Sequence, residues 1–234
     1  MQAVILAAGE GKRMRPLTNL CPKPLIEVAG KPLVEHIIEA LPSVVDEVII
    51  VIGYKGAMIQ EHLGERHGTR RIRYVEQAVP EGTAKALALT RPHLSGRFFI
   101  LCADDLHGAP ALAKAACYPL AILAAEHSEP QKFGVIEADR TGMLRTFTEK
   151  PKKPTSHLVS TGALVLDDRI FSYSVRPHAN GESYLTTQVA ALAKDALVKV
   201  VLQDFWMPVG YPEDIPLAEA ALKRTYTNTS SDQK

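Results

Sequence analysis

The chain has 234 residues, of which 46% are hydrophobic and 23% are charged, and its formal net charge is +1. This balance is ordinary for a globular protein and excludes a surface dominated by positive charge of the kind that binds nucleic acid. The three cysteines, Cys21, Cys102 and Cys117, are odd in number and far apart, which excludes a disulfide framework.

The first half of the chain alternates between apolar runs and segments with helical spacing. The apolar runs, typical of buried strands, are residues 4–8, 47–52, 72–76 and 98–102. The helical segments are residues 33–41, 57–62 and 83–89. Such alternation predicts a mostly parallel, Rossmann-like sheet with helices on both faces. Ligands of these sheets bind at the carboxyl ends of the strands, so we expect the site after residues 8, 76 and 102.

The second half reads as shorter strands followed by two helices. The expected strands are residues 121–125, 134–137, 144–148, 163–166 and 198–202, and the helices are residues 185–196 and 212–221. No linker interrupts residues 1–225, so we expect a single domain, followed by a polar, disordered tail at 226–234. The apolar N-terminus is short and lacks a charged flank, and no stretch is long enough to span a bilayer. These features predict a cytoplasmic protein.

A glycine-rich, basic loop follows the first expected strand. It reads Gly9-Glu10-Gly11-Lys12-Arg13 and continues to a second arginine at position 15. Glycines let the backbone approach a phosphate and turn its N–H groups inward, and the cations supply the charge that a triphosphate needs. The loop is neither a G-x-G-x-x-G fingerprint nor a Walker loop, because Met14 stands at the third glycine position and no G-K-[ST] follows.

Several short motifs occur in an order and spacing that resemble the sugar nucleotidyltransferases. This family includes the glucose-1-phosphate thymidylyl- and uridylyltransferases and the mannose-1-phosphate guanylyltransferases. The matching segments run through the whole chain: G-x-G-x-R-M-x-P-L-T at 9–18, P-K-P-L at 22–25, G-K-P-L at 30–33, E-Q at 76–77, G-T-A at 82–84, D-D at 104–105, F-G-V at 133–135, E-K-P at 149–151, T-G at 161–162, G-E at 181–182, and Trp206 with V-G-Y-P-E-D at 209–214. The resemblance implies the α/β fold of the nucleotide-diphospho-sugar transferases.

The resemblance also implies four catalytic residues. Arg13 is expected to contact the β- and γ-phosphates, and Lys23 to bridge the reacting phosphates. Asp104 is expected to hold Mg²⁺, a hard cation that prefers carboxylate oxygens and neutralises phosphate charge. Lys150 is expected to bind the phosphate of the sugar 1-phosphate.

Further positions are implied as substrate contacts. Gln77 is expected to hydrogen-bond the base, and glutamine there resembles the thymidylyl and uridylyl members. Glu149 is expected to accept sugar hydroxyls, while Thr83 either contacts substrate or caps the helix that begins beside it. The remaining expected contacts are small or second-ranked residues along the same loops and strands: Ala7, Ala8, Gly9, Gly11, Gly82, Asp105, Gly134 and Gly162.

One position departs from the family pattern. Members usually carry W-x-D-x-G-T near the C-terminal end, and its aspartate is a second metal ligand, but this chain has Pro208 there. Proline offers no side-chain ligand, and the nearby Asp204 and Asp214 are not in register. The pattern therefore puts the metal geometry, and with it the activity, in doubt.

The favoured function is nucleotidyl transfer from UTP or dTTP to a sugar 1-phosphate, with Mg²⁺ as cofactor. Expected partners are these two substrates, with a homo-oligomer left open, and neither nucleic acid nor membrane. Two alternatives stay open: a related cytidylyltransferase with another phosphorylated acceptor, and a paralogue that binds a sugar nucleotide without turnover, which Pro208 favours.

Overall fold

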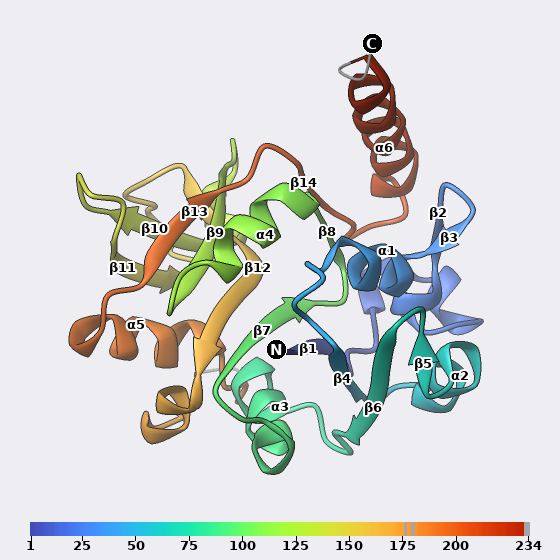
Figure 1. Ribbon diagram of the computed structural model, residues 1–234, viewed down its shortest axis with the longest axis horizontal. Coiled ribbons are helices and arrows are strands. Elements are labelled where there is room, and N and C mark those ends of the chain that lie inside the picture. Colours follow the sequence, from blue (N-terminus) through green and yellow to red (C-terminus); the bar gives the residue numbers. More distant parts are fainter. Residues whose placement is uncertain (176, 179–180, 232–234) are drawn as a thin grey trace.

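The computed structural model describes residues 1–175, 177–178 and 181–231. Within these ranges a ten-stranded sheet runs in the order β11-β10-β12-β7-β1-β4-β6-β5, with β9 and β13 joined to it beside β12 (Figure 1). Its centre is parallel: β7 (Arg97–Cys102), β1 (Gln2–Ala7), β4 (Glu47–Ile52) and β6 (Arg70–Glu76) pair in that sequence. These strands are the apolar runs of the first half, and the expected fold class is confirmed.

The long strand β12 (Leu158–Asp167) joins the second half of the chain to this centre. It runs antiparallel to β7 and also pairs antiparallel with β9 (Ala121–Glu126) and β10 (Gly134–Ala138). Two outer strands extend this side, β11 (Leu144–Glu149) beside β10 and β13 (Lys199–Leu202) parallel to β9, while β5 (Arg66–His67) closes the opposite edge. Strands of both halves therefore belong to one sheet.

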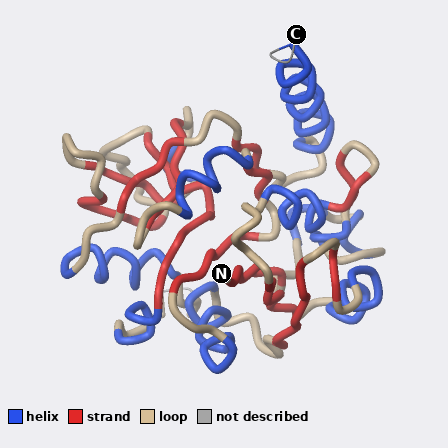
Figure 2. The backbone as a smooth tube through the Cα atoms, in the orientation of Figure 1, coloured by secondary structure: helices blue, strands red, loops and turns tan. Residues whose placement is uncertain are grey.

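Helices cover both faces of the sheet (Figure 2). On one face α1 (Leu33–Ala40), α2 (Gly56–Leu63) and α4 (Ala109–Ala116) contribute to a core that also contains Ala3 and Ile5 of β1. On the other face α3 (Thr83–Thr90) and α5 (Leu185–Asp195) contribute to a second core that contains Val4, the residue between them. Alternate residues of one buried strand thus serve two cores, which explains why its sequence is apolar without interruption.

A third, smaller core holds the glycine-rich loop in place. Here the two-stranded ladder of β8 (Asp105–His107) and β14 (Trp206–Pro208) packs with Met14 and Leu33 and with the beginning of α6 (Asp214–Ser231). The hairpin of β2 (Glu27–Val28) and β3 (Lys31–Pro32) lies beside it. Single 3-10 turns occur at Lys12–Met14, Leu17–Asn19, Lys23–Leu25, Arg91–His93, Pro130–Lys132 and Asp168–Ser172.

Several elements were absent from the sequence expectations: helix α4 and the short strands β2, β3, β5, β8 and β14. Two elements, β12 and α6, are longer than expected. Helix α6 projects from the body of the molecule and continues through residues 226–231, where we expected no regular structure, while 232–234 lie outside the described residues (Figure 1). Extending an existing helix costs less than nucleating one, so a polar sequence can follow an apolar one into it. No helix in the described part of the chain is long and apolar enough to cross a membrane.

Candidate active site

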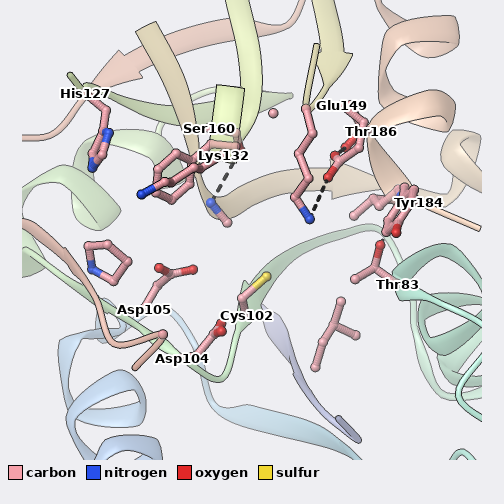
Figure 3. A pocket seen from close by; sticks show the side chains of 18 of the residues that line it. Thr83, Cys102, Asp104, Asp105, His127, Lys132, Glu149, Ser160, Tyr184 and Thr186 are labelled. Carbon is pink, nitrogen blue, oxygen red and sulfur yellow. Dashed lines mark hydrogen bonds and ion pairs between the residues drawn. The ribbon is translucent and has the colours of Figure 1, made fainter. Parts of the chain in front are cut away.

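A cavity of about 550 Å³ lies where β1 and β7 end and β11 and β12 face them. One wall carries Asp104, Asp105 and Cys102, and the wall across the cavity carries Glu149 and Thr186 (Figure 3). The cavity is therefore at the carboxyl ends of the parallel strands, where the alternating sequence pattern predicts a ligand site.

Lys23 and Asp104 form an ion pair at the edge of this cavity. The Lys23 Nζ lies 2.7 Å from the Asp104 Oδ2, and the lysine is only 8% exposed. Burial would raise the pKa of Asp104, but the Lys23 ammonium and the Arg13 guanidinium lower it below its ordinary value. Asp104 is thus held as a carboxylate in a site that would otherwise favour its neutral form.

Asp105 has the opposite electrostatic character. Burial and the neighbouring charge of Asp104 raise its pKa well above the ordinary value. Its Oδ1 accepts a hydrogen bond from the Trp206 Nε1 at 3.1 Å. Its Oδ2 occupies the space above Gly162, where an added Cβ would lie 2.6 Å away. The glycine therefore admits this carboxylate close to β12.

Across the cavity, Glu149 and Lys150 stand at the end of β11. Thr186 donates to the Glu149 Oε2 at 2.5 Å, and the Lys150 Nζ lies 3.5 Å from the Glu149 Oε1. Lys150 has a φ of 39°, an unusual backbone conformation for a residue with a side chain. Its ammonium lies 5.7 Å from the ring centroid of Tyr184 and its side chain is 56% exposed, so it faces both the cavity and solvent.

Arg13 reaches the cavity from the glycine-rich loop. Its guanidinium carbon lies 4.9 Å from the ring centroid of Tyr211, a cation–π geometry. Asp214 holds the backbone beside Tyr211 in place, because its Oδ2 accepts hydrogen bonds from the N–H groups of Gly210 and Tyr211 at 2.7 and 2.8 Å. Asp214 also lines the cavity, but its Oδ2 is occupied by these two hydrogen bonds.

Six of the expected substrate contacts are not among the residues that line this cavity: Ala7, Ala8, Gly9, Gly11, Gln77 and Gly82. Gly11 has a φ of 62°, and a Cβ there would lie 3.1 Å from that of Lys23. A Cβ on Gly53, the residue after β4, would meet the backbone oxygens of Ala8 and Gln77, so Gly53 lies between the ends of β1 and β6. Gln77 is buried and its Nε2 donates to the Gly82 carbonyl at 3.4 Å. Ala7 is the last residue of β1 and Gly9 follows two positions later. Gly134, by contrast, lines the cavity with a Phe147 ring packed against it.

Thr83 lines the cavity and does not cap its own helix, so only the capping alternative was wrong. The N-cap of α3 is Gly82, with no side-chain hydrogen bond. Instead the Thr83 Oγ1 accepts from the backbone N–H of Leu185, the first residue of α5, at 2.9 Å. The side chain satisfies an unpaired donor of a distant helix, a contact that local sequence cannot reveal.

Sequence reasoning missed an aromatic and a basic group in the lining. His127, Phe133 and Trp206 lie with ring centroids 4.6 to 6.0 Å apart, beside Lys132. Phe133 and Trp206 belong to two of the family motifs, but the sequence does not show that their rings line one cavity. Lys132 immediately precedes the F-G-V motif, and this position was the one sequence feature that could have marked it as a site residue.

The acidic wall fits a hard divalent cation. One ligand atom each from Cys102, Asp104 and Asp105 lies within 4.8 Å of the others. The Asp104 carboxylate suits Mg²⁺, which binds one or two carboxylates and completes its shell with phosphate and water. Burial and the nearby carboxylates raise the pKa of the Cys102 thiol well above its ordinary value, so this sulfur is a thiol and no ligand for a hard ion.

Pro208 faces the same wall. It lines the cavity and pairs with Asp105 in the β8–β14 ladder. Neither Asp204 nor Asp214 takes its place: Asp204 does not line the cavity, and Asp214 is held by backbone donors.

Comparison with known proteins gives one consistent family. Residues 2–225 match the family described as nucleotidyl transferase. The bifunctional protein GlmU of Methanocaldococcus jannaschii is 33% identical over 218 residues, covering 92% of this chain and 52% of that protein. The UTP–glucose-1-phosphate uridylyltransferase AglF of Haloferax volcanii is 30% identical over 242 residues, covering 98% and 100%.

Other relatives widen the range of nucleotides. Mannose-1-phosphate guanylyltransferase 1 of Arabidopsis thaliana is 34% identical over 228 residues, covering 92% of this chain and 62% of that protein. The chain therefore spans about half the length of some curated relatives, such as GlmU, and the full length of AglF. A crystal structure of a UDP-glucose pyrophosphorylase complexed with UDP-glucose superposes with a TM-score of 0.85 at 21% identity, covering 96% and 98%, which shows the shared fold.

Proposed function

Because this chain belongs to the nucleotidyl transferase family, we propose that it transfers a nucleotidyl group to a sugar 1-phosphate. The donor is a nucleoside triphosphate, and the products are a nucleoside-diphosphate sugar and pyrophosphate. The observation that carries the proposal is the arrangement of the cavity, with Arg13 and Asp104, which is paired with Lys23, on one side and the Glu149–Lys150 pair across from them. Positively charged groups thus lie on both sides of one space.

The reaction needs no protein nucleophile. A phosphate oxygen of the sugar 1-phosphate attacks the α-phosphorus, and the bond from this phosphorus to the pyrophosphate oxygen breaks. Lys23 neutralises charge on the reacting phosphates, and Arg13 receives the leaving pyrophosphate. Lys150 orients the attacking phosphate, while Glu149, held by Thr186, accepts sugar hydroxyls. Positioning and charge neutralisation are sufficient for such a displacement.

Mg²⁺ is the cofactor that the acidic wall would hold. Asp104 is its principal ligand in this proposal, since Lys23 contacts one of its oxygens and the carboxylate stays charged. When bound, the ion supplies neutralisation of the phosphate charge that develops during transfer.

We propose UTP or dTTP as the donor. Gln77 follows the end of β6, and among the described residues its amide makes one long hydrogen bond, at 3.4 Å, to the Gly82 carbonyl. A glutamine amide offers a donor and an acceptor to the edge of a pyrimidine. A site built to pair with one base edge rejects another base by leaving polar groups unpaired. The name of the Haloferax relative supports UTP, and that of the Arabidopsis relative supports GTP.

A pyrophosphate-release assay tests the proposal. UTP, dTTP, CTP, ATP and GTP are each combined with several sugar 1-phosphates and with phosphocholine, in the presence of Mg²⁺. We expect release with UTP or dTTP and a sugar 1-phosphate. A preference for GTP or ATP would overturn the base assignment, and release with phosphocholine and CTP alone would favour the cytidylyltransferase.

A binding protein without turnover is the second candidate, and Pro208 is the observation that favours it. Calorimetry with nucleoside-diphosphate sugars distinguishes the two. Binding without pyrophosphate release for any pair would identify a non-catalytic paralogue.

A further inference from the structure

A second group of metal-ligating side chains lies away from the active site. Within the described ranges, two clusters of three or more His, Cys, Asp or Glu side chains have ligand atoms within 4.8 Å of one another, and one of them is the acidic wall of the cavity. The other consists of Glu35, Glu39 and His67. His62 adjoins it, because its Nε2 lies 2.6 Å from the Glu35 Oε1.

The backbone brings these four residues together from three elements. Glu35 and Glu39 are four residues apart on α1, so they lie one turn apart on the same face. His62 is in the last turn of α2, and His67 is in β5 just beyond the turn at Gly64 (Figure 1). The segment from His62 to His67, here called the α2–β5 corner, thereby places two imidazoles beside the carboxylates of Glu35 and Glu39.

Three of the four ligand atoms, from Glu35, Glu39 and His67, lie within 4.8 Å of one another, and His62 joins them through its contact with Glu35. Both histidines direct Nε2 towards the carboxylates, at 2.6 Å for His62 to Glu35 and 3.6 Å for His67 to Glu39. Lys31 contacts the Oε2 of Glu39 at 2.5 Å, whereas His67 faces the Oε1 of the same carboxylate. Glu39 can therefore keep its lysine contact on one oxygen and bind a cation through the other.

The donor set determines which cation fits. Two imidazole nitrogens and two carboxylate oxygens match a tetrahedral Zn²⁺, which takes nitrogen at about 2.0–2.1 Å and oxygen at about 2.0–2.2 Å. Mg²⁺ and Ca²⁺ prefer sites made of oxygens alone. Two neutral imidazoles and two carboxylates also balance the double charge of the ion. Four protein ligands leave no open position, which is the pattern of a structural site and not of a catalytic one.

We propose that Glu35, Glu39, His62 and His67 form a structural binding site for Zn²⁺ or a similar transition-metal ion, which joins α1 to the α2–β5 corner. The side chains are partly exposed, between 22% and 44%, so the ion can enter from solvent without unfolding of the chain. The site is separate from the proposed reaction and does not depend on it.

The test uses the full chain without a histidine tag, stripped of metal and kept in excess Mg²⁺ to occupy the acidic wall. Co²⁺ serves as a spectroscopic probe, and Zn²⁺ is titrated by calorimetry. We expect one Co²⁺ per chain with the strong visible absorption of a tetrahedral complex, displaced by Zn²⁺. Zn²⁺ should also raise the thermal unfolding midpoint.

The variants His67→Gln and Glu39→Gln each remove one ligand while keeping the size of the side chain. Loss of outer-shell partners alone weakens metal binding about ten- to a hundredfold, so each variant should weaken it at least tenfold. His93→Gln, an exposed histidine outside the cluster, is the matched control and should bind as the wild type does. Asp104→Asn should also retain Co²⁺ binding. The proposal is overturned if wild type binds no Co²⁺, or if Asp104→Asn abolishes binding while the His62→Gln, His67→Gln double variant retains it.

Discussion

Asp105 and Pro208 lie directly opposite one another in the ladder between β8 and β14. Side chains at directly opposed positions of an antiparallel pair lie on the same face, about 4.5–5.5 Å apart at Cβ. Both residues line the cavity. A carboxylate at position 208 would therefore stand beside Asp105, on the wall that we propose for Mg²⁺.

Pro208→Asp should consequently lower the Mg²⁺ concentration needed for half-maximal rate, because it adds an oxygen ligand where the wild type has none. Pro208→Ala is the matched control: it removes the ring and its fixed φ without adding a ligand. Steady-state rates over a Mg²⁺ titration measure the effect. If Pro208→Ala changes the Mg²⁺ concentration for half-maximal rate as much as Pro208→Asp does, the change results from the altered backbone and not from the added carboxylate. Turnover in Pro208→Asp alone would mean that the natural chain is a non-catalytic paralogue.

Asp104→Asn should lower kcat by orders of magnitude. The amide keeps the shape of the side chain but removes the charge that pairs with Lys23 and would hold the cation. Single-turnover nucleotide transfer measures the loss, with Asp204→Asn as a control outside the cavity lining. Full activity in Asp104→Asn would show that the metal is held elsewhere.

Lys23→Ala should reduce kcat/KM and slow turnover. A charge-assisted contact contributes about 1.5–3 kcal/mol, which corresponds to roughly ten- to a hundredfold in rate. Circular dichroism should show an intact fold, since Lys23 lies at the cavity edge and not in an apolar core. Wild-type kinetics would remove this lysine from the site.

Lys150→Ala should chiefly raise the KM for the sugar phosphate, by a similar factor, because this lysine lines the cavity on the side that we propose for the acceptor. Lys152→Ala, an exposed lysine two residues further on, is the control. An equal effect of the two variants would indicate a general loss of positive charge and no specific contact.

The pH dependence of stability should reflect His107. Burial lowers the pKa of this imidazole from 6.5 to about 4. Between these values the unfolded chain binds a proton that the folded chain does not, so stability is complete above pH 6.5 and falls as the pH drops towards 4. The loss corresponds to roughly 3 kcal/mol if unfolding is two-state. Urea unfolding of wild type and His107→Leu over this pH range checks it, and the variant should show a shallower slope. Parallel slopes would contradict the assignment.

Regular elements with local signals could be predicted from the sequence. The β-branched run at 47–52 coincides with β4, and the spacing of Leu33, Val34, Ile37 and Ile38 locates α1. The uninterrupted apolar strands also predicted a sheet covered on both faces. The acidic pair at 104–105 was correctly expected to follow a strand of the sheet centre.

The contacts between distant segments could not be predicted in this way. The pairing of Asp105 with Pro208 and the hydrogen bond from Leu185 to Thr83 each join residues about a hundred positions apart. Such contacts depend on strand register and loop closure, which no local pattern encodes. Helix α4 was missed although its buried Leu112 and Ala115 have helical spacing and the proline in its first turn is compatible with a helix.

The junction between residues 81–84 and 183–185 has a consequence for substrate selection. Ser183 donates from its backbone to Glu81 and accepts from Ala84, and Gly82 meets it so closely that an added Cβ would lie 2.5 Å from the Ser183 oxygen. Together with the Leu185–Thr83 bond, these contacts fasten the two halves of the chain beside the cavity. The distance between the two walls of the cavity is therefore fixed by contacts within the chain, before the proposed substrates bind. The cavity should therefore discriminate between acceptors by its fixed size and shape, with little closing motion on binding. To accept a larger sugar, the side chains that line the cavity would have to be shortened, because loosening the junction would not enlarge it.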